Sequence, residues 1–199
     1  TAGGAFEIEV NTCTAETEPN GTPATAGALA CPITGGITVA DEDDFFSLGT
    51  PAANARVFAM ADGVSGSSTD FDMRITNATI TLQYDDTGND SQFGGLAPSI
   101  SGTILSAVPS YIAMNHFSAS TTSEPYRLYS VVQPPIASAT AETEPNNTSA
   151  TANTSAINYV SASLSSSTDV DFFSFTAAAG DLIYVAMDND PLRDNTPIN

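Results

Sequence analysis

The sequence predicts an all-β protein made of tandem β-sandwich domains of jelly-roll or Greek-key type. Short segments carry the period-two alternation of a half-buried strand, as in "ITLQY", where Ile80, Leu82 and Tyr84 alternate with polar residues. Turn sequences rich in glycine, proline and aspartate separate these segments, for example "DGVSG" and "TSEP". No segment sustains a helical apolar period over three turns, so helix is expected only in short turns.

An internal repeat sets the domain organisation. The phrase "TAETEPN" occurs at residues 14–20 and again at residues 140–146. The match extends well past this phrase, and the aligned pairs of segments are 15–26 with 141–152, 41–51 with 168–178, and 57–62 with 184–189. One unit therefore begins near Ala15 and a second begins near Ala141.

The two units share a succession of predicted strands. In "FFSL" the residues Phe46 and Leu48 lie on one face of a strand, and Phe173 and Phe175 do the same in "FFSF". The segment "DLIYVAM" (181–187) is a continuous apolar run, which is typical of a central strand that is covered on both faces. Strands of this kind require a second layer to cover them.

The first residues of the chain predict a strand that belongs to a different unit. In "GGAFEIEV" (3–10), Phe6, Ile8 and Val10 alternate with polar residues. This segment stands before the first "TAETEPN" as "EPYRLYSVV" stands before the second, so it corresponds to the last strand of a preceding unit.

The second unit lacks counterparts of "ITNATITLQY", "SISGTILS", "YIAMNHFSA" and the closing strand. A half-sandwich exposes apolar faces and sheet edges. We therefore expect the strand 3–10 of one copy, or its equivalent from a preceding unit, to pair with the second unit of another copy. The predicted organisation is 1–12 as a strand of a preceding or neighbouring unit, 13–134 as the first sandwich, 135–140 as a linker and 141–199 as the first half of a second sandwich.

The charge of the chain excludes several classes of partner. There are 23 acidic residues against four arginines and no lysine, which gives a net charge of −19. Such a surface repels phosphate backbones and anionic lipid headgroups, so neither nucleic acid nor membrane insertion is expected. No apolar run approaches the ~18 residues that a membrane helix needs.

Several features favour a secreted or cell-surface protein. Cys13 and Cys31 flank the first repeated phrase with no CxxC motif or histidine nearby, which favours a disulfide, with two free thiols as the alternative. The sequence also holds candidate N-glycosylation sites, at Asn20, Asn77, Asn89, Asn146, Asn147 and Asn153.

No pattern of catalytic residues is present in the sequence. The single histidine, His116, lies among alternating apolar residues of a predicted strand. Neither a Gly-x-Ser-x-Gly nor a His-Glu-x-x-His motif occurs. We therefore expect a protein that is not an enzyme.

Five short motifs follow one another in the first unit: Glu-Pro-Asn, an Asp-x-Asp-Phe-Phe strand, the Asp-x-Asp strand "DFDMRI", an acidic hairpin with glycine, and the aromatic closing strand "EPYRLYSVV". In this order they resemble the bacterial pre-peptidase C-terminal domain family, over residues 15–133 and again over the opening half of a second copy at 141–199. The collagen-binding modules of clostridial collagenases are similar. The resemblance implies a calcium-tolerant extracellular β-sandwich, usually appended to secreted proteases and other exported proteins.

Calcium is the one cofactor that the sequence suggests. Ca²⁺ takes about six to eight oxygen ligands, and Glu16, Glu18 and Asn20 point the same way on an extended strand. In the collagen-binding modules that the chain resembles, calcium lies between this phrase and the turn before the "FFS" strand. That turn adds Asp41, Asp43 and Asp44. The second copy offers Glu142, Glu144, Asn146, Asp169 and Asp171, with Thr168 in the place of Asp41. The alternative is a metal-free arrangement, in which these carboxylates cap turns and accept backbone hydrogen bonds.

Two functions are compatible with these observations. The first is a structural or adhesive surface protein, a pilus-like fibre whose copies assemble head to tail by strand complementation, with extracellular matrix or polysaccharide as candidate binding partners. The alternative is a pair of accessory domains, binding calcium or matrix, at the C-terminus of a secreted protease or other hydrolase.

Overall fold

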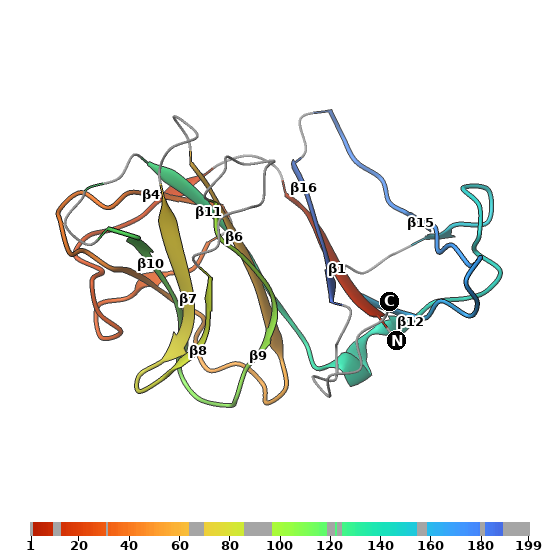
Figure 1. Cartoon of the computed structure of the whole chain (residues 1–199), viewed down its shortest axis with the longest axis horizontal. Coiled ribbons are helices and arrows are strands. Elements are labelled where there is room, and N and C mark those ends of the chain that lie inside the picture. The colour runs from red at the N-terminus through yellow and green to blue at the C-terminus, as the bar shows by residue number, and fades with distance from the viewer. Residues whose placement is uncertain are drawn as a thin grey trace. The chain divides into compact units, whose positions relative to one another are not determined.

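The computed structural model describes residues 2–9, 13–30, 32–63, 70–85, 97–118, 122, 125–154, 159–179 and 182–188 (Figure 1). Over these residues the protein is all-β, and its one helical element is a 3-10 turn, η1 (Ile136–Ser138). The predicted fold class is therefore confirmed. No helix among the described residues is long and apolar enough to cross a membrane.

The chain forms two compact units. One consists of Thr12–Val132, and the other combines Thr1–Asn11 with Gln133–Asn199. The predicted linker 135–140 contains η1 and lies at the start of the C-terminal part of this second unit.

The first unit is a sandwich of two five-stranded sheets. One sheet has the order β3-β5-β10-β7-β8 and the other has the order β2-β4-β11-β6-β9. Their strands are β2 (Thr14–Ala15), β3 (Gly27–Ala28), β4 (Ile33–Gly35), β5 (Asp44–Ser47), β6 (Arg56–Gly63), β7 (Phe71–Asn77), β8 (Thr81–Asp85), β9 (Ser99–Ile104), β10 (Ser110–His116) and β11 (Tyr126–Gln133).

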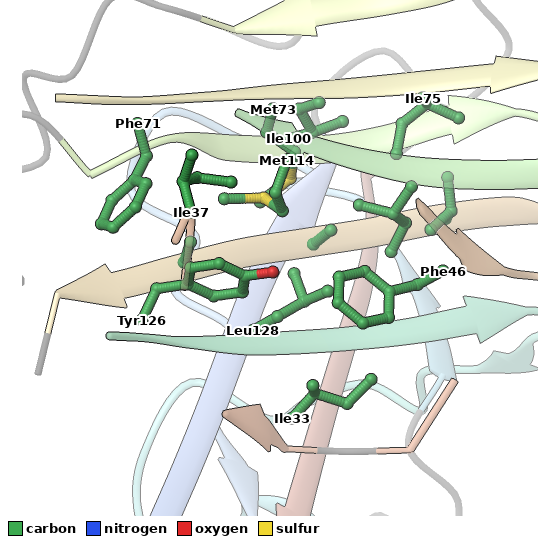
Figure 2. Packing of buried hydrophobic residues seen from close by; sticks show 14 of the residues in the cluster. Ile33, Ile37, Phe46, Phe71, Met73, Ile75, Ile100, Met114, Tyr126 and Leu128 are labelled. Atoms are coloured by element: carbon green, nitrogen blue, oxygen red, sulfur yellow. The ribbon is translucent and has the colours of Figure 1, made fainter. Parts of the chain in front are cut away.

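The core of the first unit lies between the two sheets. Alternation along β6 sends Val57, Ala59 and Ala61 into it, and all three are fully buried. Figure 2 shows Tyr126 of β11 beside Ile37 and Leu128 in this core. Its ring meets that of Phe71 edge to face at a centroid distance of 5.3 Å. Each large apolar side chain buried in this way contributes roughly 1.5–3 kcal/mol to stability.

The second unit draws its strands from both ends of the chain. The strands are β1 (Ala2–Glu9), β12 (Thr140–Ala141), β13 (Asn153–Thr154), β14 (Tyr159–Ala162), β15 (Phe173–Ser174) and β16 (Leu182–Asp188). Four of them form a sheet in the order β12-β14-β1-β16, and β13 pairs with β15. In Figure 1, β1 (red) lies alongside β16 (blue), as their antiparallel register requires.

The backbone repeats between the units as the sequence does. Thr14 of β2 pairs with Ile33 of β4, and the corresponding Thr140 pairs with Val160. Likewise the register of β3 against β5 recurs in β13 against β15. Every position in one pair of strands therefore has a defined counterpart in the other unit.

The structure contradicts one prediction about the second unit. The run 181–187 was predicted to be covered on both faces, but Val185 is 63% exposed and Met187 is 69% exposed, so that prediction is wrong. Among the described residues, β15 pairs only with β13, whereas β5 of the first unit pairs with both β3 and β10.

Candidate functional sites: two acidic clusters and a closing-strand slot

Two clusters of three carboxylates occupy equivalent places in the two units. One consists of Glu16, Glu18 and Asp44, and the other consists of Glu142, Glu144 and Asp171. Within each cluster, one oxygen of every carboxylate lies within 4.8 Å of the others. Such groups of oxygen ligands suit a hard cation.

Backbone hydrogen bonds bring the two parts of the first cluster together. The N–H of Glu16 donates to the carbonyl of Thr34 at 2.9 Å, which extends the pairing of β2 with β4. The N–H of Phe45 donates to the carbonyl of Asn20 at 3.0 Å and so fixes the start of β5, where Asp44 lies. The cluster is therefore built by pairing between segments that are distant in sequence.

The first cluster is held by donors from its own surroundings. The N–H of Gly36 donates to Glu16 Oε1 at 2.7 Å, and Asn20 Nδ2 donates to Glu16 Oε2 at 3.1 Å. The N–H of Asn20 donates to Glu18 Oε2 at 2.8 Å. These bonds fix the two glutamates, while Asn20 Oδ1 is buried with no hydrogen-bond partner.

Tyr126 completes this cluster from the closing strand β11. Its hydroxyl donates to Asp44 Oδ2 at 2.7 Å and lies 3.4 Å from Glu16 Oε2. Tyr126 and Asp44 are both fully buried, and Asp44 Oδ1 has no hydrogen-bond partner. This tyrosine lies in "EPYRLYSVV", where the sequence pattern indicates an aromatic closing strand but not a contact with the acidic cluster.

Gly35 makes room for the tyrosine. A Cβ on Gly35 would lie 2.5 Å from the Tyr126 hydroxyl and 2.7 Å from Glu16 Oε2. Real Cβ atoms do not approach neighbours so closely, and both neighbours are held by hydrogen bonds. The first cluster therefore needs a residue without a side chain at this position.

Burial dominates the electrostatics of the first cluster. It raises the pKa of the Asp44 carboxyl to about 8, although the hydrogen bond from Tyr126 acts in the opposite direction. Burial also raises the pKa of Glu16. Desolvated carboxylates that lie this close repel one another when they are charged, so Asp44 keeps its proton to a higher pH than an exposed aspartate does.

The second cluster repeats this geometry with weaker enclosure. Glu142 accepts from the N–H of Ser163, the counterpart of Gly36, and from Asn146 Nδ2 at 3.3 Å. Asn146 also donates its N–H to Glu144 Oε2 at 2.8 Å. Burial, and then the charge of Glu142, raise the pKa of Asp171 to about 6.

Three predicted metal ligands lie outside the clusters. Asp43 forms an ion pair with Arg74 at 2.6 Å, and Asp41 is exposed with a φ of 62°. Asp169 accepts from the N–H of Ser165, and Glu42 does the same for Thr38 in the first unit. These carboxylates organise the turn before β5 or β15.

Two of the candidate glycosylation sites are fully buried. Asn20 and Asn146 each donate Nδ2 to a cluster glutamate, so neither nitrogen is accessible in the folded chain. Asn147 is exposed, and Asn77 and Asn153 are partly exposed. Asn89 lies outside the described residues.

Cys13 is exposed and forms no disulfide among the described residues. Cys31 lies outside them, and the disulfide stays a prediction. Thr14 donates its N–H to the carbonyl of Pro32, so the segments next to the two cysteines run side by side.

The third feature is the slot that β1 fills in the second unit. The sheet order β12-β14-β1-β16 reproduces β2-β4-β11-β6 of the first unit, so β1 stands where the closing strand β11 stands. The pairing also agrees, because β1 is antiparallel to β14 and β11 is antiparallel to β4. Phe6 and Ile8, two of the residues predicted for strand donation, face Val185 and Ile183 in the register with β16. Val10 lies outside the described residues.

No protein-family model matches the sequence, and no curated protein matches it. Among solved structures, the chain is similar to the pre-peptidase C-terminal domain of a collagenase from Bacillus anthracis, with 11% sequence identity and a TM-score of 0.39. The similarity covers 62% of this chain and 100% of that chain. This likeness carries no conclusion about the function of the protein.

Proposed function

We propose that the chain is a non-catalytic, extracellular structural or adhesive β-sandwich protein whose copies join head to tail by exchanging strand β1. The observation that carries the proposal is the position of β1 in the closing-strand slot of the second unit. A surface fibre of this kind would contact extracellular matrix or polysaccharide, and its acidic surface favours cations over nucleic acid.

Exchange between copies keeps every hydrogen bond of the slot. The strand pairs with β14 over Ala2–Ala5 and with β16 over Gly3–Glu9. The same pairs form when β1 comes from another copy, because an exchanged element makes identical contacts in both arrangements.

The covalent layout of the chain favours a linear assembly. β1 belongs to the second unit, whereas β2, which begins at Thr14, belongs to the first. A copy that places its β1 in the second unit of a neighbour leaves its own slot free for the next copy. This contact is heterologous and propagates as a filament.

Calcium is proposed at both acidic clusters. The ligand set consists of oxygen atoms alone, and the buried Oδ1 atoms of Asp44 and Asn20 lack hydrogen-bond partners, as expected of atoms that face a cation. When bound, calcium would join the repeated phrase to the start of β5 or β15 and neutralise the carboxylates.

The test is the size of the assembly with and without β1. Light scattering on the intact chain should show oligomers or fibres that grow with concentration, and deletion of residues 1–12 should yield monomers or short oligomers. A matched control replaces residues 1–12 by a Gly/Ser segment of equal length, which has no apolar alternation and should behave like the deletion. A dispersed monomer of the intact chain would remove the fibre function and favour accessory domains of a secreted hydrolase.

A further inference from the structure

The two closing-strand slots differ at one matched pair of positions. In the first unit Tyr126 of β11 faces Gly35 of β4. In the second unit Ala2 of β1 faces Ala162 of β14. The shared register makes these pairs equivalent, since Thr34 and Ser161 accept the same backbone hydrogen bond from Glu16 and Glu142 respectively.

The pair in the first unit is large against small. The Tyr126 hydroxyl occupies the space that a Cβ on Gly35 would need, at a distance of 2.5 Å. The hydroxyl is fixed there by its hydrogen bond to Asp44, and the tyrosine is fully buried, so it cannot turn away without leaving Asp44 without its donor. The slot of the first unit therefore requires glycine on β4 and accepts tyrosine on the closing strand.

The pair in the second unit is small against small. Residue 162 carries the methyl group that position 35 must lack, and the strand that enters brings alanine at the facing position. A tyrosine placed there in the register of β11 would meet this methyl group as it would meet a Cβ on Gly35. Ala162 is partly buried, and a tyrosine crowded against its methyl group would cost stability.

We infer that Ala162 determines which strand closes the second unit: it admits the strand Ala2–Glu9 and rejects a closing strand that carries tyrosine at the facing position, as β11 does. The inference concerns the slot on which the proposed function rests, but it holds whether β1 comes from the same chain or from another copy. In an assembly it prevents β11 of one copy from competing with β1 of the next for the second slot. Each slot is then filled by one strand in one register.

A double-mutant cycle in the full chain tests this inference. The variants are A2Y, A162G and A2Y/A162G, and the readout is hydrogen exchange of the backbone amides of β14 (Tyr159–Ala162). The amides of β4 (Ile33–Gly35) report the first unit in the same sample. Exchange at β14 follows local opening of this sheet, so it responds to the fit of the strand in the slot.

In A2Y we expect exchange at β14 to accelerate about tenfold or more, because the tyrosine overpacks against Ala162. A162G alone should accelerate exchange about fivefold at most, the cost of a glycine in a strand. In the A162G background, adding A2Y should change exchange by less than about threefold, because glycine makes room for the ring. A tyrosine at Gly3, on the opposite face of β1, is the matched control and should act equally in both backgrounds.

Equal acceleration by A2Y with alanine or glycine at position 162 overturns the inference, as does no acceleration with alanine. If A2Y fails to fold, recovery in A2Y/A162G supports the inference, and failure of both variants overturns it. Light scattering on the same samples tests the proposed function separately. If the chain is monomeric and the substitutions at positions 2 and 162 are coupled, the role of Ala162 stands and head-to-tail assembly is refuted. If the chain is oligomeric and the two substitutions are not coupled, assembly stands and the role of Ala162 is refuted.

Discussion

Replacing Tyr126 with phenylalanine should destabilise the first unit by about 1–3 kcal/mol, measured without metal. The substitution removes one oxygen, whose hydrogen bond to Asp44 Oδ2 is 2.7 Å long. Asp44 is fully buried and its other oxygen already lacks a partner, so the variant leaves a buried carboxyl group with no donor. The estimate is the cost of an unsatisfied buried acceptor, and the aromatic ring and its apolar contacts remain.

Urea unfolding in EDTA, followed by circular dichroism, measures this loss as a shift of the midpoint at constant slope. Tyr111→Phe is the matched control, since Tyr111 lies in the same sandwich, is partly exposed and contacts Phe45 through its ring. The ring remains in this variant and no buried carboxyl group loses a donor, so the control should lose at most about 1 kcal/mol. Equal stabilities of Tyr126→Phe and the unmodified chain would refute the view that this hydroxyl supports the cluster.

Two further predictions concern the charges of the clusters. Calcium should raise the melting temperature, because binding to the folded state adds about 2.7 kcal/mol to the free energy of unfolding at a hundredfold excess over Kd. Replacing Glu16 and Glu18 together with glutamine should remove the part of that shift that belongs to the first unit. The metal hypothesis fails if EDTA-treated and calcium-loaded samples melt together. Without metal, stability should fall as pH rises from about 4 to about 8, because the raised pKa of Asp44 means that the folded chain holds a proton which the unfolded chain releases. One such proton changes stability by at most about 1.4 kcal/mol per pH unit, and urea midpoints that rise with pH would contradict the assignment.

The sequence predicted the elements that depend on local pattern and on the repeat. Alternation located the strands, and the repeated phrase indicated that Glu16 with Glu18 and Glu142 with Glu144 form equivalent groups. The order of motifs also predicted that residues 3–10 act as a closing strand, and β1 lies in that position in the second unit of its own chain. Exchange between copies preserves the same strand pairs. The sequence pattern is therefore the same whether β1 comes from its own chain or from another copy.

The contributions that sequence reasoning missed come from long-range pairing. Tyr126 reaches Asp44 only because β11 returns beside β4, and Gly35 matters only through that return. The aspartates of the turn before β5 were predicted to bind calcium, but Asp43 forms an ion pair with Arg74. Ile80 and Tyr84 alternate as predicted but are 58% and 47% exposed, whereas Leu82 between them packs against the core.

Disulfide trapping between differently labelled copies tests strand exchange most directly. Gly3 of β1 faces Ser161 of β14, and facing strand residues lie close enough for a disulfide. Cysteine is placed at position 3 in one copy and at position 161 in another, both with Cys13 and Cys31 replaced by serine, and the two are mixed, unfolded and refolded together under oxidation. The control replaces Thr34, which faces Arg127 of β11 in the equivalent position of the first slot. Strand exchange predicts a covalent dimer for the 3 and 161 pair and none for the 3 and 34 pair. No dimer from the mixed copies, with efficient closure when both cysteines are in one chain, would contradict head-to-tail assembly.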